Sequence, residues 1–113
     1  EKAYRELYKL LNPGGILINF DADYSAALDD EEEHELPANH AHKLVPDYMQ
    51  AENESITMEI GAYHQPRPQW DVQLLVEAGF ERVTVDMGVY KRIYAEIDEF
   101  FNPTPIFTIV AYK

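Results

Sequence analysis

"LLNPGGILINFDADY", residues 10–24, is the stretch of sequence that decides the fold. A helical pattern of apolar residues ends at residues 12–15, and an almost continuous apolar run, residues 16–20, follows at once. Proline and glycine interrupt a helix, because proline has no backbone N–H and glycine loses the most conformational freedom on folding. A strand that is apolar at successive positions is typically covered on both faces, as in a parallel sheet. The stretch therefore predicts a helix, a tight turn and a central strand.

The chain divides into three zones within one domain, which is what 113 residues allow. Residues 1–24 form the helix, turn and strand. Residues 25–68 change character and form an acidic and helical insertion, with six acidic residues among positions 29–35 and several prolines. Residues 69–113 contain a helix and a closing pair of strands. Alternation of helices and strands predicts an α/β protein.

Within the insertion, apolar residues recur at helical spacing between Pro46 and Pro66. The spacing predicts one amphipathic helix over residues 47–63, with something apolar lying under it. Its apolar positions are Met49, Ile56, Ile60 and Tyr63.

The closing zone repeats the order of the first. A helix over residues 70–78 is expected to end at Gly79, and a strand with alternating apolar residues is expected over residues 81–85. Residues 105–112 are again almost continuously apolar. A last strand of this composition is expected to lie between other strands and not at an edge of the sheet.

Charge and composition exclude several classes of function. The net charge of -12 repels phosphate groups, which argues against nucleic acids and anionic membranes as partners. The absence of cysteine excludes disulfides and thiolate metal sites. No apolar run reaches the roughly 18 residues that span a bilayer, and no signal-peptide pattern is present. We expect a cytoplasmic protein.

The residues and their order resemble a known family. "LNPGGILINFDADY" is similar to the helix, turn and fifth strand of class I S-adenosylmethionine-dependent methyltransferases. "LLVEAGF", "RVTVD" and the terminal "PIFTIVAYK" are similar to that family's closing elements. The resemblance implies the C-terminal half of a Rossmann-like sheet: three strands, of which the last is antiparallel and lies between the other two, with flanking helices.

The same resemblance implies that the cofactor-binding half is absent from this sequence. The family binds S-adenosylmethionine through a Gly-rich turn after its first strand and an acidic residue after its second. No such glycine pattern can be written here, because Gly14 and Gly15 precede a strand and the other three glycines stand alone. We therefore expect no cofactor-binding residues in this chain and no activity from it alone. With its first strand unpaired, the chain is expected to form a homodimer.

What remains is chemistry on the side of the methyl acceptor, which we expect to be a small molecule. In open α/β sheets the binding crevice lies at the carboxyl ends of the parallel strands. Asp21 and Asp23 leave such an end, either to orient or deprotonate an acceptor or only to cap a turn. Tyr24, Tyr63 and Tyr94 are candidates for the pocket wall. No residue is assigned a catalytic role.

A different class of function uses the histidines. Two of them, His40 and His42, are spaced so that an extended chain presents two imidazoles, and acidic residues precede them. Imidazoles and carboxylates together bind zinc and other divalent ions. The alternative is therefore a non-enzymatic acidic module that holds a metal or a basic partner, although the acidic run itself is expected to be a solvated loop and we predict no metal site.

Overall fold

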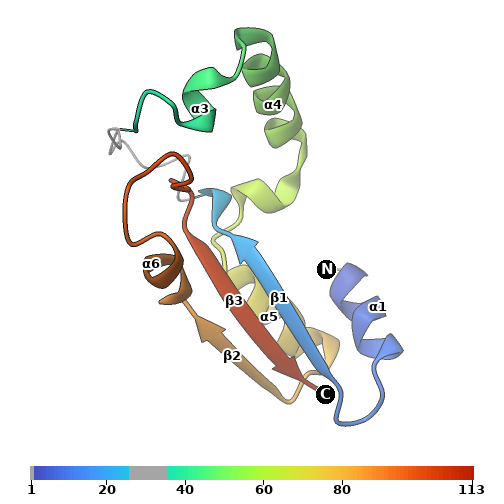
Figure 1. Ribbon diagram of the computed structural model, residues 1–113. Coiled ribbons are helices and arrows are strands. Elements are labelled where there is room, and N and C mark those ends of the chain that lie inside the picture. Colours follow the sequence, from blue (N-terminus) through green and yellow to red (C-terminus); the bar gives the residue numbers. More distant parts are fainter. Residues whose placement is uncertain (1, 26–35) are drawn as a thin grey trace.

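The computed structural model describes residues 2–25 and 36–113. The acidic run at residues 29–35 lies outside the described residues. The order of elements confirms the predicted alternation (Figure 1). Along the chain, the elements are α1 (Lys2–Leu10), β1 (Ile16–Ala22), α3 (Ala41–Leu44), α4 (Asp47–Glu59), the 3-10 helix η1 (Gly61–His64), α5 (Gln69–Ala78), β2 (Arg82–Asp86), α6 (Val89–Ile93) and β3 (Ile106–Tyr112).

The described residues form one open sheet of three strands in the order β1-β3-β2. The terminal strand β3 runs antiparallel to both neighbours, so β1 and β2 are parallel to each other. In the register of the sheet, Ala111 of β3 lies opposite Leu17 of β1 on one side and Val83 of β2 on the other. The prediction that the last strand is antiparallel and lies between the other two is confirmed.

Two glycines form the connections that the sequence predicts. Gly14 has a φ of 80° in the turn between α1 and β1, and Gly79 has a φ of 117° at the end of α5. Glycine adopts these angles without the steric cost of a Cβ atom. A Cβ at Gly79 would also lie 2.9 Å from the ring of Tyr8, so this helix end is in close contact with α1.

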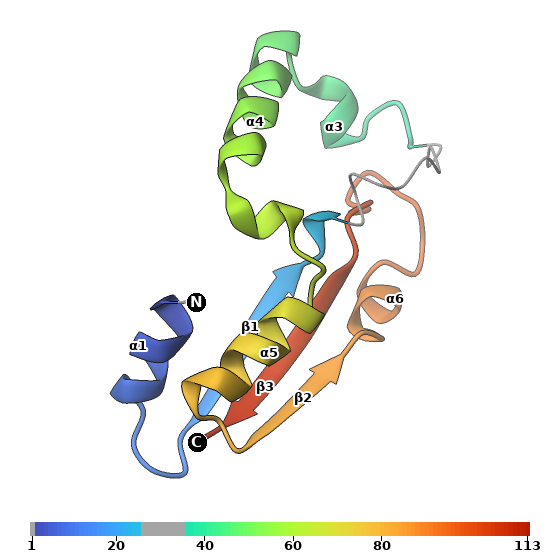
Figure 2. The same cartoon turned by 180° about the vertical axis from the view of Figure 1, so that it is seen from behind.

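Both flanking helices pack on one face of the sheet. Figure 2 shows α5 lying over the strands and roughly along their direction, with α1 to one side. This layer contains the core, in which alternate residues of β3 pack against α5 and the turn that follows it. The fully or almost fully buried members of the core are Leu75, Phe80, Phe107, Ile109 and Ala111.

The opposite face of the sheet is open, and β1 lies at the edge. Ile16, Ile18 and Phe20 point to this face and are 50%, 68% and 57% exposed. The prediction of a central strand covered on both faces is therefore wrong for the described residues. Exposure along β1 alternates, because only the side chains that point toward α1 and α5 find a covering layer.

The insertion forms an arm of helices, α3, α4 and η1, which stands beyond the carboxyl end of β1 (Figure 1). The predicted helix over residues 47–63 is shorter than expected: α4 ends at Glu59, and Tyr63 lies on η1. The expected apolar layer under the helix is also wrong for the described residues. Met49 and Ile56 are about half exposed, and α4 buries no side chain.

Candidate functional site

A cavity of about 400 Å³ lies where the arm meets the carboxyl end of β1. Its walls come from the end of β1 and the residues just after it, from the three helices of the arm, and from the segment that leads into β3. The cavity lies at the strand end where the sequence predicts a binding crevice. The described lining residues are Ala22, Tyr24, His42, Asn53, Thr57, Tyr63, Asn102 and Thr104.

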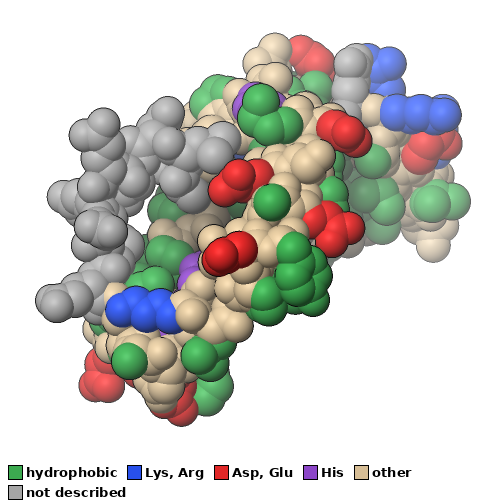
Figure 3. All heavy atoms as spheres, turned by 90° about the horizontal axis from the view of Figure 1, so that it is seen from above, with side chains coloured by type: hydrophobic (Ala, Val, Ile, Leu, Met, Phe, Trp, Pro, Cys, Tyr) green, Lys and Arg blue, Asp and Glu red, His purple; other side chains and the backbone are tan. Residues whose placement is uncertain are grey.

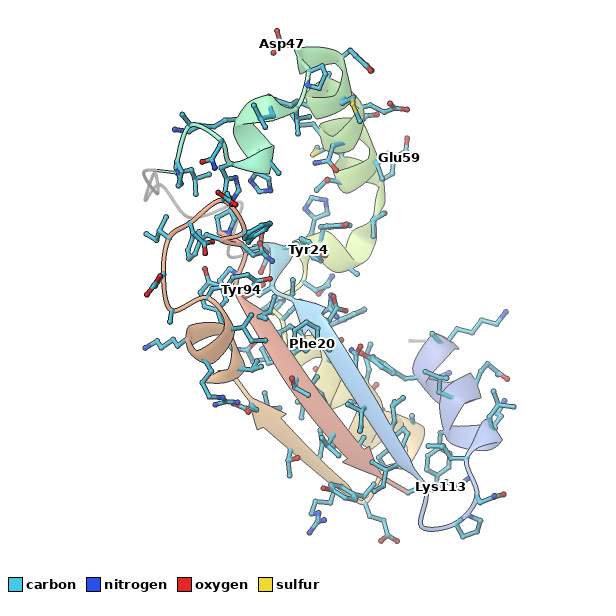
Figure 4. All side chains as sticks on the ribbon, in the orientation of Figure 1. Phe20, Tyr24, Asp47, Glu59, Tyr94 and Lys113 are labelled. Atoms are coloured by element: carbon cyan, nitrogen blue, oxygen red, sulfur yellow. The ribbon has the colours of Figure 1, made fainter. Side chains whose placement is uncertain are left out.

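Two predicted wall residues meet in this cavity. The rings of Tyr24 and Tyr63 lie with their centroids 4.2 Å apart and tilted by 52°. Burial, the neighbouring Tyr63 and the negative charge of Asp21 raise the pKa of the Tyr24 phenol above its ordinary value. Tyr24 is therefore a neutral phenol at physiological pH. Figure 4 shows Tyr24 at the end of β1, beneath the arm.

Apart from the imidazole of His42, the remaining polar lining consists of uncharged amides and hydroxyls. On α4, the hydroxyl of Thr57 donates to the backbone carbonyl of Asn53 at 2.8 Å. Before β3, the side-chain oxygen of Asn102 accepts from the backbone N–H of Thr104 at 3.0 Å. These bonds leave the side-chain amides of both asparagines with hydrogen-bonding groups to offer a ligand.

His40 attaches the arm to the segment before β3. Its Nδ1 accepts from the backbone N–H of His42 at 3.1 Å, so Nε2 carries the proton and donates to the carbonyl oxygen of Phe101 at 2.5 Å. Both nitrogens of this buried ring are engaged. The alternative in which His40 and His42 hold a metal together therefore conflicts with the geometry. Among the described residues, no three His, Asp or Glu side chains are grouped so as to hold a metal ion.

Asp21 lies beside the cavity, where it binds an arginine. Arg67 donates to Asp21 at 2.6 Å and makes two bonds to Asp71, at 2.5 and 2.8 Å. The other oxygen of Asp21 accepts from the backbone N–H of Ala22 at 2.8 Å. Of the two roles left open for Asp21, its bonds in the folded chain match the structural one.

Arg67 and Asp71 are at the centre of a network that joins β1, α1 and α5. Asp71 also accepts from the Tyr4 hydroxyl at 2.6 Å, and Asn19 donates to the same hydroxyl at 3.1 Å. Burial alone would lower the pKa of Arg67, but its bonds to Asp71 and Asp21 outweigh that effect and raise it. The arginine is therefore permanently charged, and the carboxylates of Asp21 and Asp71 balance its charge.

Asp23 and Tyr94 do not line the cavity. The carboxylate of Asp23 accepts from the Ser25 hydroxyl at 2.7 Å. The Tyr94 ring packs against Tyr90 and Phe101, with centroids 5.7 and 6.1 Å away. Of the five predicted candidates, the structure brings together Tyr24 and Tyr63.

Sequence reasoning missed the polar lining and the arginine network. The four-residue spacing of Arg67 and Asp71, just before and within a helix, is a usable signal for an ion pair. Asn53, Thr57, Asn102 and Thr104 carried no comparable signal, because they come from segments about fifty residues apart.

Comparisons of the chain with protein-family models, with curated proteins and with solved structures found no match. In the described part of the chain, no helix has both the length and the apolar character needed to cross a membrane.

Proposed function

We propose that this chain is the C-terminal, substrate-side part of a class I S-adenosylmethionine-dependent methyltransferase that acts on a small molecule in the cytoplasm. The observation that carries the proposal is the strand order β1-β3-β2. Two parallel strands, each preceded by a helix and a glycine-containing turn, are separated by an antiparallel strand that comes last in the chain. The resemblance in sequence implies the same order.

The position of the cavity supports the proposal. Ligands of open α/β sheets bind outside the carboxyl ends of the parallel strands. The cavity lies at this end of β1, under an inserted helical arm. In the proposed enzyme the residues of this chain bind and orient the methyl acceptor, which is a major contribution to the rate of a bimolecular transfer.

The uncovered surface around β1 also supports a larger sheet. On the other face of the sheet, where α1 packs, Leu10 is 80% exposed and Leu7 is 38% exposed. An unpaired strand edge presents free backbone N–H and C=O groups, so a further strand can add to the sheet there. A neighbouring strand with its own helix would pair with the β1 edge and cover the apolar residues of α1.

The residues of this chain do not fit the cofactor itself. β1 continues into Asp23 and Tyr24 without a glycine. After β2, Gly88 is the one glycine, and its backbone N–H already donates to Asp86 at 2.9 Å. Neither strand end is a Gly-rich turn of the kind that brings backbone close to a bound cofactor. We therefore assign cofactor binding to the other half of the proposed enzyme and the acceptor to this one.

The reading frame upstream of Glu1 provides the test. It should encode a strand followed by a Gly-rich turn and, after the next strand, an acidic residue. The protein expressed from that longer frame should transfer a methyl group from S-adenosylmethionine to a small acceptor. A longer protein without that pattern, or without methyl transfer to any acceptor in a broad small-molecule panel, would reject the proposal.

An acidic binding module for a basic protein partner is the second candidate. It is favoured by the acidic side chains that α4 exposes next to apolar ones, as Figure 3 shows for this end of the molecule. Binding of a basic amphipathic peptide to α4 that weakens steeply with salt, in a protein without methyl transfer, would favour this candidate over the enzyme. Asp47, Glu52, Glu54 and Glu59 are the acidic residues of α4.

A further inference from the structure

We infer that the cavity at the end of β1 binds an uncharged ring compound that carries hydroxyl or other hydrogen-bonding groups. The inference deepens the proposed function and rests on it in one respect, namely that this ligand is the methyl acceptor. The binding itself requires neither a methyl donor nor any residue beyond the described chain. Three features of the cavity carry the inference: its size, the absence of charge in its described lining, and its two phenol rings.

The size of the cavity suits one small molecule. A volume of about 400 Å³ falls at the lower end of the range of about 300–1,000 Å³ that is typical of ligand pockets. The walls belong to segments that are far apart in the sequence, since Tyr24 follows β1 whereas Thr104 precedes β3. A ligand in this cavity would therefore contact the sheet and the arm at the same time.

The eight described lining residues include no aspartate, glutamate, lysine or arginine. Asp21 is the carboxylate beside Tyr24, and both of its oxygens are already hydrogen-bonded, one to Arg67 and one to the backbone. A charged ligand loses hydration on entering a cavity and needs an opposite charge to compensate. This lining offers none, and the net charge of -12 opposes anions further.

The ring preference comes from Tyr24 and Tyr63. Both rings line the cavity, and aromatic rings pack favourably in offset or edge-on geometry. The side-chain amides of Asn53 and Asn102 add both N–H donors and C=O acceptors to the lining. A hydroxylated ring matches both features, whereas a purely apolar ring would leave the amides without partners.

His42 adds to the lining a hydrogen-bonding group that no described residue uses. Its ring contacts His40 edge-on, with centroids 4.9 Å apart, and within the described residues no hydrogen bond reaches its ring nitrogens. His40, in contrast, uses both of its nitrogens to attach the arm. We therefore expect a ligand hydroxyl to bond to His42, and the His42 ring signals to report on binding.

Three probes with the same phenol ring and different charge test the inference. They are 4-hydroxybenzyl alcohol, which is neutral, 4-hydroxybenzoate, an anion, and tyramine, a cation. The chain is titrated with each at pH 7, without a methyl donor, and the ring signals of Tyr24, Tyr63 and His42 are followed by NMR. We expect saturable shifts with the neutral probe and at least tenfold weaker binding of the two ions. Equal or tighter binding of either ion, or shifts confined to other residues, would overturn the inference.

Substitutions locate the site. Tyr63→Phe and Asn53→Ala should each weaken binding of the neutral probe about fivefold or more, which corresponds to the loss of one hydrogen bond of about 1 kcal/mol. Tyr48→Phe is the matched control, since Tyr48 lies on α4, is 71% exposed and does not line the cavity. Unchanged signals from Leu75 and Ile109 would verify that each variant is folded. Equal affinities of the three variants would contradict the assignment of the site.

The outcome is separable from that of the proposed function. Binding of the neutral probe to this chain, together with absence of methyl transfer by the longer protein, would reject the methyltransferase and keep the binding site. Methyl transfer to a charged acceptor would keep the methyltransferase and reject the inference.

Discussion

The sheet layer and the helical arm are stabilised in different ways. In the sheet layer, Leu75 and Phe107 are completely buried, and Arg67 joins Asp71 in a buried ion pair. In the arm, no helix buries a side chain, although the cap residue His40 is buried. Polar contacts attach it, among them that of His40 with Phe101 and that of Asn39 with Glu99 at 2.5 Å.

This difference suggests a division of roles: the sheet layer stabilises the fold, and the arm supplies residues of the cavity. The free energy of folding comes from the sheet layer, since it buries the apolar surface. The arm contributes Asn53, Thr57 and Tyr63 to the cavity while burying little apolar surface of its own. Ligand-binding segments are drawn from the less stable parts of a structure. We therefore expect the arm to open at a lower cost in free energy than the sheet.

The largest loss of stability is expected from Arg67→Met. It leaves the carboxylate of Asp71, which is completely buried, without its partner, and such a change costs about 3–5 kcal/mol. Urea denaturation measures the loss. Arg92→Met is the matched control, because Arg92 pairs with the exposed Asp86 and should cost nothing measurable. Equal losses in the two variants would contradict the account of the network.

A pair of leucine substitutions compares the two regions directly. Leu75→Ala in the core should cost about 2–5 kcal/mol, because it leaves a cavity in close-packed surroundings. Leu44→Ala in the arm, where the side chain is 68% exposed, should cost less than about 0.5 kcal/mol. Both values come from denaturation midpoints at an unchanged slope. A comparable loss for Leu44→Ala would mean that the arm packs against apolar surface.

Tyr4→Phe sharpens the account of the network through pH. Burial, the hydrogen bond to Asp71 and the charge of Asp71 raise the pKa of the Tyr4 phenol above its ordinary value of 10.0. The folded chain therefore keeps this proton when the unfolded chain has lost it, so stability is full below about pH 10 and falls as the pH rises above it.

Tyr4→Phe should cost about 1.5–3 kcal/mol at neutral pH, as expected for a hydrogen bond to a charged group, and should flatten the alkaline fall. Denaturation curves between pH 7 and 11 measure both effects. An alkaline fall as steep in Tyr4→Phe as in the wild type would show that another group is responsible.

His40→Ala should act on the arm and leave the sheet intact. It removes the cap of α3 and the hydrogen bond to Phe101, so the free energy needed to open the arm should fall by about 1–2 kcal/mol. Hydrogen exchange should speed up over α3 and α4 while the amides of β3 keep their protection. Equal acceleration in β3 would show that the two regions open together.

A substitution at the edge of β1 is expected to have the smallest effect on stability but to change the oligomeric state. We propose that the 113-residue chain by itself dimerises by pairing the open edge of β1 with a second copy of β1. Light scattering behind a sizing column should give a dimer at high micromolar concentration. Ile18→Lys should shift it to monomer, because charge on an edge strand opposes pairing, whereas Ile56→Lys on α4 should leave it a dimer. A monomeric wild type would show that the edge is covered from within.

The sequence predicted the sheet better than the arm, for physical reasons. The Pro-Gly-Gly turn, Gly79 and the apolar runs are local signals, and they located the three strands, whereas the antiparallel direction of the last one was implied by the family resemblance and the local signals wrongly made β1 central. The spacing of Met49 and Ile56 located α4. It did not show whether anything packs against the helix, because apolar spacing indicates which side of a helix is apolar and not what lies next to that side. Tyr24 was a candidate because of its place after the strand, and Tyr63 belonged to the predicted helix, so no signal in the sequence indicated that the two rings would meet. The bonds of Asp21 to Arg67 and to the backbone could not be read from the sequence either, because Arg67 lies 46 residues away.

The central claim is that this chain holds the acceptor side of a methyltransferase and depends on a further strand beside β1 for the cofactor. Isothermal titration with S-adenosylmethionine at high micromolar concentration tests it most directly, on the 113-residue chain and on the protein expressed from the longer reading frame. The account predicts no binding to the chain alone and one-to-one binding to the longer protein. A one-to-one isotherm with the chain alone, or no binding to the longer protein, would contradict it.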